Sequence, residues 1–365
     1  MIFESLRNKG NIRKDQDAFT VAELLVASAI LALLVVLLLT MVNQTSKTWK
    51  STSGKIEEFR GARDAFDTIT RRLSQATLNT YLDYVTNSNG VPTAYQRQSE
   101  LRFLSGPTKT ILSSLASLSK VPTMSVFFQA PNGFTTNSSN SILQNALNTW
   151  GYFLEYASDT NGVPAAVLAK GYNPRYRYRL MELMEPTENL SVYNYTSGNR
   201  SYTNIDWISN SMILTTNRPA HVLAENVIAL IILPKLSPAD YNVTNSLAPN
   251  GYTNYSLAPN FTYDSSTNLN SNSPIDANLN THNQLPPVIQ VTMVAVDETS
   301  AVRFANTYSN LMNMYSSSNL FQYASNLPTD LTNLGSILAA KQINYRIFTT
   351  DVMIKGAKWS GSQTN

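Results

Sequence analysis

Residues 19–42 read FTVAELLVASAILALLVVLLLTMV, and this run decides the architecture of the N-terminal part of the chain. It contains no Lys, Arg, Gly or Pro and a single acid, Glu23. As a helix rising 1.5 Å per residue it would be about 36 Å long, enough to cross a hydrocarbon layer of about 30 Å with some tilt. The run therefore predicts a transmembrane helix over residues 19–42.

Residues 1–18 form a polar leader ahead of this helix. Its basic residues outnumber its acids: Arg7, Lys9, Arg13 and Lys14 stand against Glu4, Asp15 and Asp17. Short flanks rich in Lys and Arg are retained in the cytoplasm. We therefore expect the leader to stay cytoplasmic and everything after residue 42 to lie outside the cytoplasm.

A cleaved secretory signal is the competing interpretation, because Ala27-Ser28-Ala29 resembles a signal-peptidase site. The apolar part of such a signal is short and ends at its cleavage site. Here the apolar run continues well past Ala29. Cleavage at that position would leave an apolar, unanchored end, so the pattern favours a retained helix.

Glu23 is the unusual residue of the run, because a carboxylate in an apolar helix costs about 2.5 to 3.5 kcal/mol near the bilayer centre. The local order is a polar leader, the small residue Ala18, then Phe19, Thr20 and Glu23, followed by an uninterrupted apolar helix. This order resembles the class III signal of type IV pilins and type II secretion pseudopilins. An ordinary membrane anchor with Glu23 near the headgroups, where no partner is needed, remains the alternative.

The resemblance implies that a prepilin peptidase cuts between Ala18 and Phe19 and methylates the new amino group of Phe19. It also implies that Glu23 pairs with the terminal ammonium of a neighbouring pilin or pseudopilin subunit during assembly. Two positions depart from the usual pattern: Ala18 stands where Gly is common, and Thr40 where major pilins often have a helix-kinking Pro. Both departures favour a minor subunit or a pseudopilin.

Residues 43–84 predict an amphipathic continuation of the same helix. Apolar residues recur in steps of mostly three and four, at Trp49, Ile56, Phe59, Ala62, Phe66, Ile69, Leu73 and Ala76. Opposite charges lie at helical spacing on the other face, as in Arg63 and Asp67. The basic cluster Arg60, Arg63, Arg71 and Arg72 is interleaved with acids, so it is interpreted as a solvated face.

Residues 85–365 predict a β-rich head outside the membrane. Short apolar or alternating runs separated by turn residues indicate antiparallel strands at 101–104, 124–129, 150–157, 176–184, 222–233, 288–296 and 343–354. The fold class is therefore α+β: a long N-terminal helix packed on an antiparallel sheet. Within the head, 235–283 is expected to be an exposed Asn/Ser/Pro-rich loop and 305–340 a helical insertion. The alternating residues 175–179, RYRYR, predict a half-buried strand with a solvated basic face.

Several head strands carry a weaker resemblance. Residues 223–233, 287–297 and 345–352 resemble the strand pattern of J-type minor pseudopilins. Together with 178–183, YRLMEL, they resemble the Verru_Chthon cassette group of pilin-like proteins, in particular its protein C. This resemblance implies shared processing and brings no substrate.

Composition and motifs argue against catalysis, cofactors and nucleic-acid binding. Only 14% of residues are charged and the net charge is +3, whereas a phosphate-binding surface needs a dense basic footprint. Cys is absent, and the two histidines, His221 and His282, lack metal-ligand spacing. Ser117-Leu118-Ser119-Lys120 matches S-x-x-K without its companion motifs, and Asp276, Asn278 and Asn280 alternate without the rest of a calcium loop. We expect no enzyme, no metal and no cofactor.

The sequence thus predicts a prepilin-like structural subunit of a type IV pilus or a type II secretion pseudopilus. It would be a single-pass protein of the bacterial inner membrane, with the leader in the cytoplasm and the head in the periplasm. Its expected partners are a prepilin peptidase, other subunits and lipid. The alternative from another class is a permanently anchored envelope protein whose Asn- and Tyr-rich head binds a ligand without entering a filament.

Overall fold

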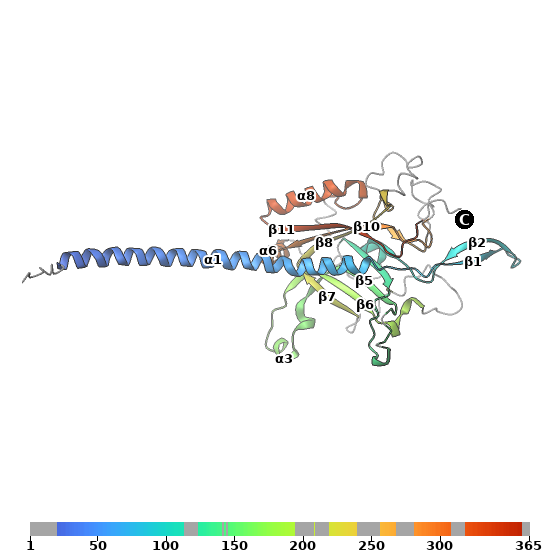
Figure 1. Cartoon of the computed structure of the whole chain (residues 1–365), viewed down its shortest axis with the longest axis horizontal. Helices are drawn as coiled ribbons and strands as arrows, with labels where there is room; N and C mark the ends of the chain where they lie inside the picture. Colours follow the sequence, from blue (N-terminus) through green and yellow to red (C-terminus); the bar gives the residue numbers. More distant parts are fainter. Residues whose placement is uncertain are drawn as a thin grey trace, which may run out of the picture. The chain divides into compact units, whose positions relative to one another are not determined.

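Helix α1, Val21–Leu73, opens the described part of the chain and runs for 53 residues (Figure 1). The computed structural model describes residues 20–112, 123–140, 142–143, 145–193, 208, 219–238, 256–267, 281–307 and 318–359. The chain divides into two units, Met1–Ile56 and Glu57–Asn365, so α1 contributes to both. The fold is α+β, as predicted.

The helix ends at Leu73, well before the predicted end of the helical stretch 43–84. Tertiary hydrogen bonds take over directly after it: the Thr77 N–H donates to the carbonyl of Gln129 at 3.0 Å. The Asn79 Oδ1 accepts the N–H groups of Glu100 and Leu101, each at 3.0 Å. Because Asn side chains of this kind offer the backbone an alternative to the helix, the chain turns away here.

A two-stranded hairpin follows the helix. Strand β1, Tyr81–Thr86, pairs antiparallel with β2, Pro92–Gln98, and the two form a sheet of their own. The predicted start of the head at residue 85 therefore falls inside β1.

The larger sheet has six strands in the order β7-β6-β5-β4-β3-β9, and its neighbours pair antiparallel. Its strands are β3 Leu104–Pro107, β4 Met124–Ala130, β5 Asn148–Ser158, β6 Tyr176–Glu185, β7 Ala220–Glu225 and β9 Tyr263–Asp264. The third sheet has the order β11-β10-β8, also antiparallel. Its strands are β8 Val227–Lys235, β10 Val288–Val296 and β11 Tyr345–Met353.

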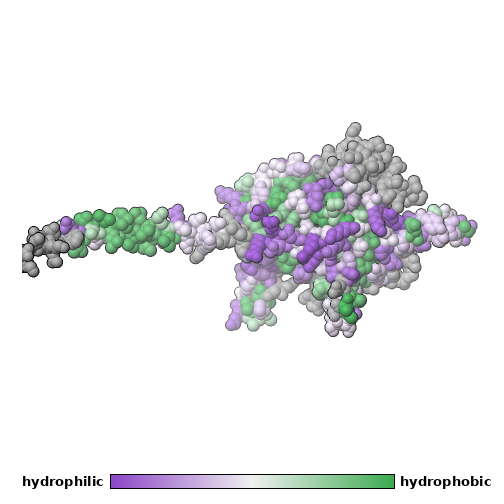
Figure 2. All heavy atoms as spheres, viewed as in Figure 1, coloured by the Kyte–Doolittle hydropathy of each residue, from purple (hydrophilic) through white to green (hydrophobic). Residues whose placement is uncertain are grey.

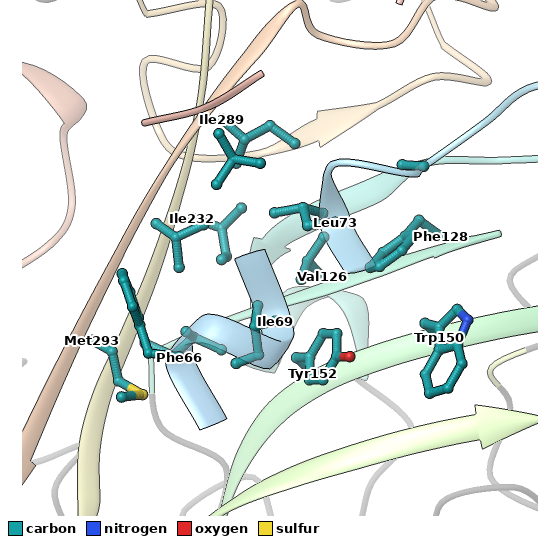
Figure 3. Close-up of a cluster of buried hydrophobic side chains, with 14 of the residues drawn as sticks. Phe66, Ile69, Leu73, Val126, Phe128, Trp150, Tyr152, Ile232, Ile289 and Met293 are labelled. Carbon is teal, nitrogen blue, oxygen red and sulfur yellow. The ribbon is translucent and has the colours of Figure 1, made fainter. Parts of the chain in front are cut away.

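The main core lies where the last turns of α1 meet both of these sheets (Figure 3). Phe66, Ile69 and Leu73 of α1 point toward Val126 and Phe128 of β4, Trp150 and Tyr152 of β5, Ile232 of β8, and Ile289 and Met293 of β10. The predicted helical stripe is confirmed at Ala62, Phe66, Ile69 and Leu73, which are all buried. It fails at its two ends, because Trp49 is 73% exposed and Ala76, although buried, lies past the last residue of the helix.

A second core covers the other face of the three-stranded sheet. Helices α6, Glu298–Thr307, and α8, Leu327–Ala340, supply Ala301, Leu327, Leu334 and Leu338 against Ile228, Ile231 and Leu233 of β8. Strand β8 is therefore buried on both faces, which explains its unbroken apolar sequence VIALIILP. The predicted helical insertion 305–340 corresponds to the end of α6 and to α8, and 308–317 lies outside the described residues.

A third cluster lies on the opposite face of the six-stranded sheet from the main core, around Phe127, Phe153, Met181 and Leu183. The other helical turns whose bounds lie in the described residues are short. They are α2 Thr108–Ile111, η2 Ser138–Asn140, η3 Asp159–Gly162, α3 Ala165–Leu168, η4 Thr187–Asn189, η5 Ser191–Tyr193 and η8 Ala324–Asn326.

Part of the predicted exposed loop 235–283 is a core element instead. Leu257, Ala258, Phe261 and Tyr263 are fully buried, and β9 extends the six-stranded sheet through its pairing with β3. The Tyr263 hydroxyl donates to the carbonyl of Gln284 at 2.8 Å. These apolar residues are too few to show a helical or strand periodicity. The prediction of a loop therefore followed the Asn-, Ser- and Pro-rich composition around them.

The predicted basic face of residues 175–179 is also wrong for two of its three arginines. Arg177 and Arg179 are buried, at 8% and 6% exposure. Arg177 pairs with Glu298 of α6 at 2.8 Å, and Arg179 pairs with Glu225 of β7 at 3.2 Å. Acidic partners from elements distant in sequence make this burial possible, and no local pattern reveals them.

Candidate membrane and assembly segment

The first turn of α1 is held by a reciprocal pair of side chains, Thr20 and Glu23. The Thr20 N–H and the Thr20 hydroxyl both donate to Oε2 of Glu23, each at 2.9 Å. In return, the Glu23 N–H donates to the Thr20 Oγ1 at 3.3 Å. Since α1 begins at Val21, Thr20 is the N-cap and Glu23 the third residue of the helix, which makes this a capping box.

The predicted processing site lies outside the described residues. Ala18 and Phe19, the two residues flanking the expected cleavage, precede the first described residue, Thr20. The S-x-x-K motif at Ser117–Lys120 and the alternating residues Asp276, Asn278 and Asn280 also fall outside that part of the chain. Of the predicted site residues, only Glu23 has a described environment.

The segment Val21–Trp49 is long and apolar enough to cross a membrane, and none of it is buried within the protein. Figure 2 shows hydrophobic side chains on the visible face of this part of α1. Leu, Val and Ile residues from Val21 to Val42 are exposed on every side of the helix. A helix that is apolar all round needs either a core or lipid around it.

Two hydroxyl groups in the most apolar part of this segment are bonded to the helix itself. The Ser28 hydroxyl donates to the carbonyl of Leu25 at 2.9 Å, and the Thr40 hydroxyl donates to the carbonyl of Leu37 at 2.7 Å. Polar side chains without water must be satisfied internally, and these two meet that condition. The helix continues past Thr40, where a proline would have removed a backbone donor.

The other end of α1 is fixed in the head by a buried carboxylate, Glu182 of β6. Arg72 of α1 donates to Glu182 and, at 3.2 Å, to the hydroxyl of Tyr152. Tyr152 donates to Glu182 at 3.1 Å, and the His221 Nε2 lies 3.1 Å from Glu182. Burial and the nearby Glu182 charge raise the pKa of Tyr152 far above its ordinary value, so the phenol stays protonated and donates.

Arg72 also lies over the ring of Trp150, with its guanidinium carbon 4.0 Å from the ring centroid. The expectation that the basic cluster on α1 is wholly solvated therefore fails at Arg72. It holds at Arg63, which lies 4.0 Å from Asp67 with both side chains mostly exposed. The position in the helix could have distinguished Arg72 from Arg63, because Arg72 lies at the end of the helix next to the buried Leu73.

The β1–β2 hairpin presents aromatic side chains to solvent. Tyr84 and Tyr95 lie opposite each other, with ring centroids 4.7 Å apart and hydroxyls 3.0 Å apart. They are 54% and 62% exposed, and Leu82 nearby is 69% exposed. Cross-strand aromatic pairs stabilise a hairpin, but two strands alone are marginally stable in water.

Comparison with protein families, with curated proteins and with solved structures gives no match for this chain.

Proposed function

We propose that this chain is a prepilin-like structural subunit, cut by a prepilin peptidase between Ala18 and Phe19. It enters a type IV pilus or a type II secretion pseudopilus as a minor component. Before assembly it lies in the bacterial inner membrane with its N-terminus in the cytoplasm and its head in the periplasm. The resemblance of residues 1–42 to the class III signal is the starting point.

The observation that carries the proposal is that the two parts of α1 have different surroundings. Its first part, Val21–Trp49, is apolar and unburied, and its last turns are core residues of the head. One acid, Glu23, lies in the first turn of the apolar part. A helix of this kind anchors the subunit in lipid and can exchange lipid for the apolar helices of neighbouring subunits without disturbing the core of the head.

The direct test is the mass of the intact protein purified from its native host. Cleavage and methylation predict a chain that starts at N-methyl-Phe19. A chain that retains residues 1–18 contradicts processing and leaves only a membrane anchor. Fragmentation of the N-terminal peptide assigns the methyl group to the terminal amine.

The role of the Glu23 charge is tested with Glu23→Gln. Glutamine can replace glutamate in a capping box, so the start of the helix should be kept while the charge is lost. We expect this variant to reach the membrane in normal amounts and to be missing from filaments, because no anion remains to pair with a neighbour's terminal ammonium. Glu23→Val, which loses the charge and the reciprocal bonds from Thr20 to the carboxylate, should also fail to enter. Normal filament entry of Glu23→Gln would contradict the ion-pair account.

The second candidate function is a permanently anchored envelope-binding protein, and the β1–β2 hairpin favours it. Tyr84, Tyr95 and Leu82 form an exposed aromatic and apolar surface, of the composition that recognition surfaces use. Under this function the leader is retained and the helix stays in the bilayer. The mass measurement therefore separates the two candidates.

A further inference from the structure

We propose that the tip of the connection between β5 and β6 is a second membrane contact of the head, and that it binds a bilayer surface with anionic headgroups. The tip consists of α3, Ala165–Leu168, and the residues directly after it, Ala169 and Lys170. The inference rests on the proposed function in one respect only, the insertion of α1 in a membrane, which both candidate functions share.

The tip is apolar and exposed. All residues from 164 to 170 are exposed, with Val167 at 45% and Leu168 at 37%. Neither side chain belongs to the three core clusters of the described residues. Figure 2 shows hydrophobic atoms on this protrusion, at the lower left of the head. The connection spans residues 159–175, whereas hairpin loops of about two to five residues are usual. A long connection with unburied apolar residues at its tip is typical of a binding loop.

The backbone of the tip is suited to an apolar environment, because its donors are bonded within the tip. The N–H groups of Val167 and Leu168 donate to the carbonyl of Pro164 at 2.9 and 3.2 Å. The Ala169 N–H donates to the carbonyl of Ala165 at 3.0 Å, and Pro164 itself has no N–H. Backbone groups that leave water must be satisfied internally, and these residues meet that condition.

The charges of the connection favour an anionic surface. Its single acid is Asp159, at the base of the connection. The Arg175 Nε donates to Oδ2 of Asp159 at 2.9 Å, and the Tyr172 hydroxyl donates to the same oxygen. The acid is thus paired with a base, and Lys170, exposed at the tip, is a further cation. A lysine beside apolar residues can reach the headgroups while the apolar side chains enter the boundary of the acyl chains.

The tip lies at the end of the head where α1 enters. Arg72, near the end of α1, contacts Trp150 and Tyr152 in the first half of β5. The connection that carries α3 follows the other end of β5, after Ser158. Figure 1 shows α3 at the same end of the head as the first turns that α1 contributes to it.

The tether to the membrane is short. The apolar segment of α1 ends at Trp49, and the head unit begins at Glu57. At 1.5 Å per helical residue this spacing is about 12 Å. The tether therefore keeps this end of the head near the bilayer, where the high effective concentration of lipid lets even a weak contact form. A second point of attachment would fix the tilt of the head on the membrane.

The first experiment locates the tip in the full-length chain, reconstituted in vesicles of phosphatidylethanolamine and phosphatidylglycerol. The chain has no Cys, so a fluorophore can be attached to a single one, introduced as Val167→Cys, Ile142→Cys or Leu31→Cys. Ile142 is the matched control, because it is 84% exposed and lies in the connection before β5, at the opposite end of that strand. Quenching is measured with a nitroxide lipid and with iodide in the water. We expect the nitroxide lipid to quench the label at 167 about fivefold more than the label at 142, and iodide to quench it less.

The other outcomes separate this inference from the proposed function. If the label at 31 is quenched by the nitroxide lipid and the label at 167 only by iodide, α1 spans the membrane and the inference about α3 is wrong. Protection of the label at 167 from both quenchers would show that protein covers the tip, which also overturns the lipid contact. If the label at 31 is not quenched by the lipid, α1 does not span the membrane, and the proposed function fails together with the inference.

The second experiment changes the tip while the label stays at 167. Leu168→Glu should reduce quenching by the lipid to the level found at 142, and Leu143→Glu, the control in the connection before β5, should leave it unchanged. Both side chains are exposed, so both variants should fold, which circular dichroism checks. Lys170→Glu should weaken quenching in phosphatidylglycerol vesicles and leave it unchanged in phosphatidylcholine vesicles. Full quenching in Leu168→Glu would overturn the proposal.

Discussion

Glu182 and Glu185 lie on the same strand, β6, and each is 2% exposed, but their surroundings differ. Glu182 faces the guanidinium of Arg72 and the ring of His221. Glu185 accepts the Ser191 N–H at 3.0 Å and the Ser191 hydroxyl at 3.2 Å. Burial raises the pKa of Glu185 to about 7, although the Ser191 bonds act in the opposite direction.

Glu185 should therefore make stability fall as pH rises. Its pKa in the folded protein, about 7, lies above its ordinary value of 4.5, so the unfolded chain releases the proton first. The contribution of Glu185 to the free energy of unfolding should fall by roughly 3 kcal/mol between pH 4.5 and 7 and stay level above that range. Glu185→Gln should remove this slope, which urea unfolding at several pH values measures. An unchanged slope in the variant would show that Glu185 is ionised when folded.

The matched control is Glu188→Gln, at the next turn of the chain. Burial raises the pKa of Glu188, but hydrogen bonds from Asn140 and from the N–H groups of Asn137 and Thr136 outweigh this and lower it. Its contribution to stability is therefore present above the ordinary pKa and lost as pH falls. The two substitutions should change the pH profile of stability in opposite directions.

Among the single elements, the apolar run 222–233 is one that the sequence pattern predicted incorrectly. Alternation and apolar content predict one strand, but the structure has two, β7 and β8, in different sheets. They are separated by Asn226, whose φ is 62°. Its N–H donates to the carbonyl of Tyr178 at 2.8 Å and its side chain donates to Glu298 at 2.8 Å. Asn tolerates this left-handed conformation, but a single Asn in an apolar run is not enough to predict a break between two strands.

Replacement of Asn226 should separate backbone strain from the lost side-chain bond. Asn226→Gly keeps the left-handed conformation and loses only the bond to Glu298, so it should cost about 1 kcal/mol. Asn226→Val adds a β-branched side chain at positive φ and should cost about 2 to 4 kcal/mol. Chemical unfolding of the two variants gives the difference. Equal losses would mean that the backbone at Asn226 is not strained.

At the scale of the whole chain, the sequence predicted the helix better than the head. The run 19–42 and the stripe through Phe66, Ile69 and Leu73 are local signals, and α1 covers the run from Val21 onward and the whole of this stripe. The head depends on pairings between distant segments, such as β9 with β3 and β10 with both β8 and β11. The same holds for the candidate site. Glu23 is recognisable from the sequence as the single acid of an apolar run, but its bonds to Thr20 and the contact between Arg72 and Glu182 are visible only in the structure.

The division of the chain at Ile56 leads to a test with two truncations. A chain starting at Glu57 keeps Phe66, Ile69 and Leu73 and loses the apolar segment, so it should be soluble and fold cooperatively. A chain starting at Ser74 also loses these three side chains and Arg72, the partner of Glu182. Each buried side chain contributes about 2 to 5 kcal/mol, and a domain is stable by only about 5 to 15 kcal/mol. The shorter chain should therefore be unfolded or insoluble, which circular dichroism and gel filtration will show. Cooperative unfolding of the chain from Ser74 would mean that the sheets form their core without α1.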